Sequence, residues 1–202
     1  MRTIALTLAL FISVQSFAGD PVKLREAFKK SYVAESRGDL AASIKALTDV
    51  YDATDYGTNL RLGWLNYSAG AFTESQGYYQ KAIDLMPASV EARLGMLYPA
   101  VALGLWDKVA RQYEEILKVD PKNTKALYNL GQIVYGKAQY DKALVHFSTG
   151  LNLYPFDYDF NLMTAWTSYR MGKTREAKVL FEKSLTIVPD DASALEGLGL
   201  VK

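Results

Sequence analysis

The chain has 202 residues, half of which are apolar, and its 23 basic side chains nearly balance 22 acidic ones. This length and composition can support a folded protein with a sizeable core. The balanced charge argues against nucleic acid or an anionic membrane surface as the main partner, because both require concentrated basic surface. The chain has no cysteine, which excludes disulfides, thiolate metal sites and a lipid-modified cysteine.

The first 18 residues differ in character from the rest. Arg2 provides a positive start, residues 4–14 form an uncharged apolar run, and the run ends near Ser16-Phe17-Ala18. This pattern predicts a secretory signal peptide over residues 1–18. A membrane anchor is the alternative, but a spanning helix needs roughly 20 apolar residues. We therefore expect residues 19–202 to be exported without membrane insertion, to a bacterial periplasm or, as the open alternative, out of the cell.

From residue 24 onward, amphipathic runs end on prolines that are spaced 34 residues apart, at Pro87, Pro121, Pro155 and Pro189. Each 34-residue step divides at a small-residue turn, and apolar residues recur at helical spacing on both sides of it. Proline disfavours helical geometry in the preceding residue and cannot donate a backbone hydrogen bond, so it ends the second helix. Each step therefore predicts two antiparallel helices.

The sizes of the repeating residues fit close helix packing. Glycine or alanine at one set of positions lets two helix backbones approach, while an aromatic ring fills the space beside them. The small set includes Gly63, Gly131, Ala143, Ala165 and Ala177, and the large set includes Phe72, Tyr79, Tyr140, Phe147 and Phe181.

This 34-residue period with small, large and proline positions resembles the tetratricopeptide repeat. The resemblance implies an all-α fold, an α-solenoid of about five helix-turn-helix repeats with a C-terminal capping helix. The expected domain is 19–202, with repeats over about 24–55, 56–89, 90–123, 124–157 and 158–191 and a cap over 192–202. The first repeat is the most divergent, because Asp55 stands at the proline position and the spacing to the second repeat is two residues short.

Two segments depart from the pattern. Pro99 lies inside the first helix of the third repeat, where we expect a kink that either reshapes the inner surface or is a tolerated distortion. At the C-terminus, Leu198, Leu200 and Val201 stand close together. They predict either an end that self-associates or a short helix folded onto the fifth repeat.

In solenoids of this kind the extended inner surface generally binds the partner, and the family resemblance implies that the first helix of each repeat lines it. Side chains at the second, fifth, ninth and twelfth places of a repeat fall on one stripe of that helix. The sequence leaves two roles open for each candidate residue: contact with a ligand in the groove, or packing between helices. The candidate residues are Phe28, Tyr32, Leu60, Trp64, Tyr67, Tyr98, Tyr128, Gln132, Tyr135, Leu162, Trp166 and Tyr169.

The ninth place is the least ordinary of these. Chaperone-binding relatives use asparagine and lysine there to hold a terminal carboxylate, whereas this chain has mostly aromatic residues, so that clamp is not expected here. Stacking aromatics suit a protein or peptide segment, and they also suit the sugar rings of peptidoglycan or an exported polysaccharide. Sugars need directed hydrogen bonds as well, for which Arg61, Asn129, Gln132 and Arg170 are candidates.

Catalytic chemistry has little support in the sequence. No nucleophile motif, phosphate loop or metal-ligand spacing is present, so neither a cofactor nor a metal is expected. His146, the one histidine, is expected to be solvated, and paired carboxylates such as Asp157 with Asp159 and Asp190 with Asp191 are expected to cap helices or face water. The sequence therefore predicts a non-enzymatic adaptor of the cell envelope that binds a protein or peptide, with glycan binding as the alternative.

Overall fold

The computed structural model describes residues 20–201, in which the chain forms eleven α-helices and no strand. The predicted signal peptide, residues 1–18, lies outside the described residues. Among the helices that are described, none combines the length and apolar character needed to cross a bilayer. The helices are α1 Pro21–Ser36, α2 Leu40–Thr48, α3 Tyr56–Ser68, α4 Phe72–Leu85, α5 Val90–Ala102, α6 Trp106–Val119, α7 Thr124–Gly136, α8 Tyr140–Leu153, α9 Tyr158–Arg170, α10 Thr174–Ile187 and α11 Ala192–Leu200.

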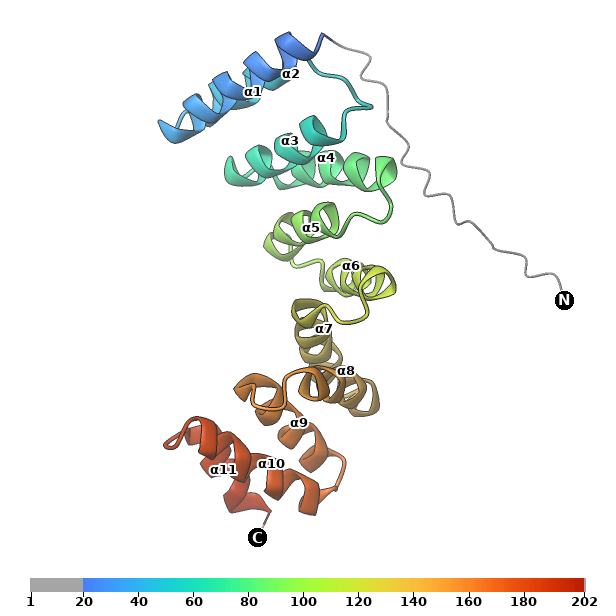
Figure 1. Ribbon diagram of the computed structural model, residues 1–202, viewed down its shortest axis with the longest axis vertical. Helices are drawn as coiled ribbons and strands as arrows, with labels where there is room; N and C mark the ends of the chain where they lie inside the picture. The colour runs from blue at the N-terminus through green and yellow to red at the C-terminus, as the bar shows by residue number, and fades with distance from the viewer. Residues whose placement is uncertain (1–19, 202) are drawn as a thin grey trace, which may run out of the picture.

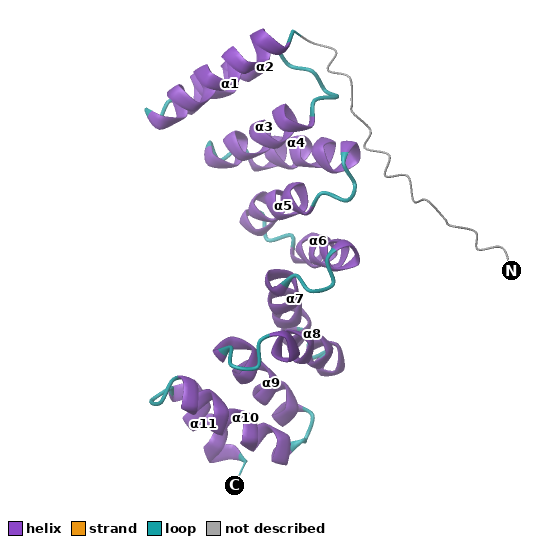
Figure 2. Cartoon of the chain, viewed as in Figure 1, coloured by secondary structure: helices purple, strands orange, loops and turns teal. Residues whose placement is uncertain are grey.

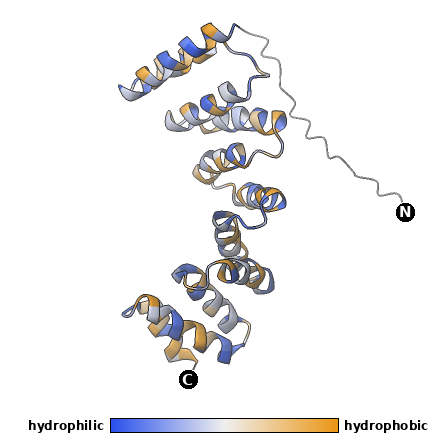
Figure 3. Ribbon diagram, viewed as in Figure 1, coloured by the Kyte–Doolittle hydropathy of each residue, from blue (hydrophilic) through white to orange (hydrophobic). Residues whose placement is uncertain are grey.

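The helices stack into an elongated array that runs from α1 and α2 at one end to α11 at the other (Figure 1). Each helix packs against the next one in the chain, and short loops join them (Figure 2). The core forms as a series of apolar clusters along the stack. Apolar and polar residues are therefore mixed along the whole array (Figure 3). The predicted all-α helical repeat is confirmed.

A polar capping residue starts the first helix of each repeat. Its side chain accepts a hydrogen bond from a backbone N–H two or three residues later, which satisfies a donor that has no partner within the helix. The caps are Asp20, Asp55, Ser89, Asn123, Asp157 and Asp191. From Asp55 onward they recur every 34 residues, so the cap marks the phase of the array.

The position of Asp55 corrects one detail of the sequence analysis. Asp55 caps α3, and the residue two places before this cap is Ala53, where the later repeats have Pro87 and its equivalents. The side chain of Asp55 accepts hydrogen bonds from the N–H and the hydroxyl of Thr58. The proline position in the first repeat is therefore filled by Ala53, and the first repeat is not two residues short.

The predicted pairing of small and large residues appears directly in the packing. A Cβ atom added to Gly131 would lie 2.5 Å from the Phe147 ring, and one added to Gly197 would lie 2.3 Å from the Phe181 ring. Ala143 is fully buried. These small residues let each aromatic ring lie flush against a neighbouring backbone.

Pro99 does not end its helix. It is buried, and α5 continues beyond it to Ala102. The carbonyl of Pro99 accepts a hydrogen bond from the N–H of Leu103, so the last turn of α5 remains closed. The proline removes one backbone donor, and the helix carries on through it.

The C-terminal helix α11 packs on α10 and α9. Val201 is buried and Leu198 is half-buried against the same cluster, so these two residues fold back onto the array. Leu195 and Leu200 remain 51% and 50% exposed. Of the three residues named for self-association, Leu200 alone is thus left exposed, and self-association through this end stays a prediction.

Candidate functional site

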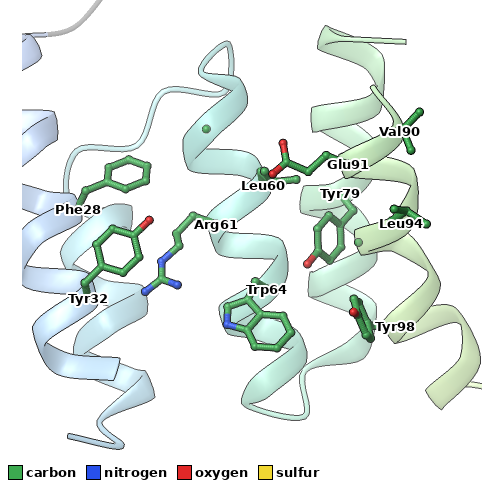
Figure 4. A pocket seen from close by; sticks show the side chains of 12 residues that line it. Phe28, Tyr32, Leu60, Arg61, Trp64, Tyr79, Val90, Glu91, Leu94 and Tyr98 are labelled. Carbon is green, nitrogen blue, oxygen red and sulfur yellow. The ribbon is translucent and has the colours of Figure 1, made fainter. Parts of the chain in front are cut away.

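A groove of about 680 Å³ lies across the first helices of the first three repeats, α1, α3 and α5 (Figure 4). We call it the N-terminal groove. Successive turns of these helices place their side chains on one stripe, as the helical period requires. The groove is lined by Phe28, Tyr32, Gly57, Leu60, Arg61, Trp64, Tyr79, Val90, Glu91, Leu94, Gly95 and Tyr98.

Three aromatic side chains of the N-terminal groove remain open to solvent. Tyr32 is 54% exposed, Trp64 39% and Tyr98 45%. The rings of Trp64 and Tyr98 meet edge to face with centroids 6.0 Å apart, and Tyr67 lies 5.3 Å from Tyr98 behind them. Aromatic pairs in such geometries stabilise each other, which holds the exposed rings in place.

Beneath these rings, a polar cluster joins α1 to α3. Arg61 forms an ion pair with Glu35, and the indole N–H of Trp64 donates to the other oxygen of the same carboxylate at 2.8 Å. The guanidinium of Arg61 also stacks on the ring of Tyr32, 4.1 Å from its centroid. This cluster therefore links α1 to α3 through charge-assisted hydrogen bonds.

The electrostatics of this cluster follow from its contacts. Partial burial alone would raise the pKa of the Glu35 carboxyl, but the hydrogen bonds from Arg61 and Trp64 and the positive charge of Arg61 outweigh it. The pKa of Glu35 is therefore held below its ordinary value, and the carboxylate stays ionised near neutral pH. Its charge is neutralised by Arg61.

A second carboxylate, Glu91, stands at the rim of the N-terminal groove in the first turn of α5. The hydroxyl of Tyr56 donates to it at 3.1 Å and also shares a hydrogen bond with the Ser89 hydroxyl at 2.8 Å. Glu91 itself is exposed. An acidic group in a first helical turn is favoured by the helix dipole, which accounts for part of its placement.

The structure divides the twelve candidate residues into three groups. Five line the N-terminal groove, and Tyr67 packs directly behind two of them. The five are Phe28, Tyr32, Leu60, Trp64 and Tyr98. They come from α1, α3 and α5, so the predicted stripe lines one continuous groove at this end of the array.

The second group lies in the middle repeats. Gln132 lines a separate pocket of about 590 Å³ with Trp106 and Tyr113. Tyr128 is half-buried between Phe147 and Phe160, with centroid distances of 6.1 and 5.7 Å. Tyr135 packs edge to face on Tyr140, 5.3 Å away. Tyr128 and Tyr135 therefore hold helices together here.

The third group belongs to the C-terminal core. The ring of Trp166 lies 5.0 Å from that of Phe181, and its indole N–H donates to the hydroxyl of Ser193 on α11 at 2.9 Å. Leu162 and Tyr169 are half-buried against the same cluster. Trp166 therefore ties the capping helix to the fifth repeat and lies away from the N-terminal groove.

The stripe analysis left out several lining residues. Arg61 and Gly95 lie between the counted places, Glu91 lies at a counted second place but was not among the candidates, and Tyr79 comes from the second helix of its repeat. Tyr79 is 3% exposed, and burial raises its pKa well above the ordinary tyrosine value. Its ring fits against Gly63 and Gly95, so a packing residue forms the floor of the groove. The glycines at the two positions that contact this ring, Gly63 and Gly95, are the sequence signal that could have revealed Tyr79 as a lining residue.

His146 is more enclosed than the sequence suggests. It is half-buried on α8, and burial lowers the pKa of its imidazole, an effect that Glu114 only partly opposes. The expectation of a solvated histidine is therefore wrong. Asp157 and Asp191 cap helices as expected. Within residues 20–201, no three acidic or histidine side chains come together in a way that could bind a metal ion.

Comparison with known proteins supports the helical-repeat assignment. Residues 100–158 match the family model described as tetratricopeptide repeat. A crystal structure of a tetratricopeptide repeat protein from Parabacteroides merdae ATCC 43184 is similar with a TM-score of 0.73 and 20% identity, over 89% of this chain and 72% of that one. A crystal structure of MamA protein is similar with a TM-score of 0.70 and 18% identity, over 84% of this chain and 94% of that one. At these identities the similarity shows the fold.

Curated relatives match parts of the chain. TPR repeat-containing protein YpiA of Bacillus subtilis (strain 168) is 24% identical over 131 residues, and a CTR9 homolog of Arabidopsis thaliana is 29% identical over 105 residues. The chain spans only 31% of the first relative and 10% of the second. Proteins with this repeat mediate protein–protein interactions on a typically non-catalytic scaffold. The chain therefore has an all-α fold like that of tetratricopeptide repeat proteins, and residues 100–158 match the model of that family.

Proposed function

We propose that this chain is a non-enzymatic adaptor that binds a segment of a partner protein in the N-terminal groove. The observation that carries the proposal is the set of exposed aromatic rings, Tyr32, Trp64 and Tyr98, that surround one hollow of about 680 Å³. Aromatic side chains dominate the energetics of protein interfaces, and exposed apolar surface in a concave site marks an interaction surface. Leu60 and Leu94 between them supply apolar walls for partner side chains.

Glycan binding is the second candidate, and the hydrogen bonding of the polar residues weighs against it. Arg61 donates a hydrogen bond to Glu35. Asn129 donates to the carbonyl of Lys125, Gln132 to the hydroxyl of Tyr128, and Arg170 to the hydroxyl of Tyr140. Asn129, Gln132 and Arg170 are also absent from the lining of the N-terminal groove, so a sugar stacked on Tyr32, Trp64 or Tyr98 would find only Arg61 of these four, already bound to Glu35.

The proposed setting is the cell envelope, in a bacterial periplasm or outside the cell. Its support is the sequence pattern of residues 1–18, a positive start followed by an apolar run and small residues. N-terminal sequencing of the protein recovered from the periplasmic fraction tests it. A chain that begins at Gly19 supports export, whereas an uncleaved chain found only in the cytoplasm contradicts it.

Site-specific photo-crosslinking tests the binding proposal directly. A photoreactive phenylalanine analogue at Tyr32 or Tyr98 is expected to capture a partner protein in cells, because both side chains project into the N-terminal groove. Tyr154 is the matched control, since it is 55% exposed on the connection before α9, far along the array from the groove (Figure 1). The captured protein should disappear when Trp64→Ala is introduced. Equal capture from Tyr154, or capture that Trp64→Ala leaves unchanged, contradicts the proposal.

A further inference from the structure

The charges of the N-terminal groove do not cancel. Arg61 is the basic residue of its lining, and it is already paired with Glu35. Glu91 is exposed, and the salt bridges found within residues 20–201 do not include it. The hydroxyl of Tyr56 is its polar contact. One carboxylate at the rim is thus left without a positive partner; it lies near Leu60, about two turns along α5 from Tyr98 (Figure 4).

The same groove contains an internal example of a cation held by an aromatic ring. The guanidinium of Arg61 lies 4.1 Å from the centroid of Tyr32. Trp64 and Tyr98 present comparable rings that are 39% and 45% exposed. Cations are attracted to the faces of such rings, tryptophan most strongly. The groove therefore offers two separate features that attract a cation, the carboxylate at its rim and the faces of its exposed rings.

We infer that the N-terminal groove selects a partner segment in which arginine or lysine stands beside apolar side chains, and that Glu91 pairs with that cation. This inference rests on the proposed function, because it names the chemistry of the segment that the groove binds. A segment that ends in a carboxylate would meet the charge of Glu91 and would find Arg61 already occupied by Glu35. The groove therefore favours basic segments over acidic ones.

The helix dipole supplies the competing explanation for Glu91, and the chain offers a control for it. Glu74 also lies in the first turn of its helix, as the third residue of α4 where Glu91 is the second residue of α5; it is exposed and is not part of the groove lining. Both glutamates support a helix start, but Glu91 alone of the two also faces the N-terminal groove. Glu91→Gln and Glu74→Gln therefore separate recognition from helix stability.

A random dodecapeptide library displayed on phage is the probe. Selection on the purified wild-type protein is expected to enrich arginine and lysine about threefold over the unselected library, next to leucine, phenylalanine or tyrosine. The Glu74→Gln protein should give the same enrichment, and the Glu91→Gln protein should lose it. For one selected peptide, changing its basic residue to glutamine should weaken binding up to about fivefold on the wild type, as expected for an exposed ion pair, and should have little effect on Glu91→Gln.

The outcomes separate this inference from the proposed function. Peptides that need Trp64 for binding but show no basic enrichment, or that keep it on Glu91→Gln, overturn the inference and leave the proposed function standing. Enrichment of acidic residues overturns it as well. If no selected peptide loses affinity on Trp64→Ala, the N-terminal groove is not a peptide site, and both proposals fail together.

Discussion

Two tryptophans at equivalent places in their repeats have different surroundings. Trp64 is 39% exposed and its ring borders the N-terminal groove, whereas Trp166 is half-buried against Phe181 and bound to Ser193. The same residue type at the same repeat position is therefore available for binding in one repeat and used for packing in another. The difference comes from α11, which lies beside α9 and covers Trp166.

This difference predicts opposite effects of two truncations. Trp166→Ala should lower the free energy of unfolding by about 2 to 4 kcal/mol, as for large-to-small changes in a core. Trp64→Ala should lower it by about 1 to 2 kcal/mol, because it loses one hydrogen bond and part of a packed ring, and should weaken partner binding tenfold or more. Urea unfolding and titration with a selected peptide measure the two quantities. Equal destabilisation with unchanged binding would place both tryptophans in the core.

His146 carries a pH prediction. Burial lowers its pKa in the folded state below the ordinary 6.5, so the unfolded state binds a proton more readily. Stability attributable to His146 is therefore present above about pH 6.5 and is lost as the pH falls through the folded-state pKa. The urea midpoint of the wild type should fall between pH 7.5 and pH 5, and His146→Gln should flatten this decline. An identical decline in the variant would show that other groups cause it.

Within each repeat, the turn between the two helices uses a residue with positive φ. In four repeats it is glycine, whereas in the fourth repeat Ala138 takes this place with φ 57°. A left-handed conformation costs an L-residue about 1 to 2 kcal/mol relative to glycine. The position within the repeat therefore fixes the backbone conformation of the turn, and Ala138 adopts this conformation at a cost in folding free energy.

The turn gives a prediction with a built-in control. Ala138→Gly should raise the free energy of unfolding by up to about 1 kcal/mol, since it relieves this strain although the glycine is freer when unfolded. Gly172→Ala, at the equivalent turn with φ 75°, should lower it by about 1 kcal/mol. Thermal and urea unfolding measure both changes. If both substitutions shift stability in the same direction, backbone strain does not govern these turns.

On the scale of the whole molecule, each helix contacts its neighbours in the array and the core is divided along the stack. Such arrays gain stability from each repeat and from each interface between repeats. Removal of a complete repeat restores an equivalent interface, because Asn123 and Asp157 cap equivalent helices. Removal of half a repeat leaves a second helix without the first helix that it packs on.

Two deletions test this organisation. Deletion of residues 124–157, which removes α7 and α8, should give a shorter helical protein that still unfolds cooperatively. Deletion of residues 124–140 removes α7, the turn after it and the first residue of α8, and leaves the rest of α8 without the first helix of its repeat, so it should abolish cooperative unfolding. Circular dichroism during urea titration distinguishes the two. Intact cooperativity in the half-repeat deletion, with loss in the full one, would refute the proposed phase.

Repeat periodicity in the sequence determined the helix pairs, the small and large packing positions and the all-α solenoid. These features depend on residues close in sequence and on a period that recurs, so they can be read without coordinates. Periodicity also placed Tyr32, Trp64 and Tyr98 on one stripe of their helices. It could not say what lies opposite each stripe.

Only the tertiary structure decided which part of the stripe becomes a groove. Trp64 is left open between α1 and α5, whereas Trp166 is covered by the capping helix α11. The ion pair between Arg61 and Glu35 links α1 to α3, and Tyr79 reaches the groove floor because Gly63 and Gly95 make room for its ring. These outcomes depend on the distances between helices of different repeats. Such distances are set by side chains far apart in sequence, which a repeating pattern treats as equivalent.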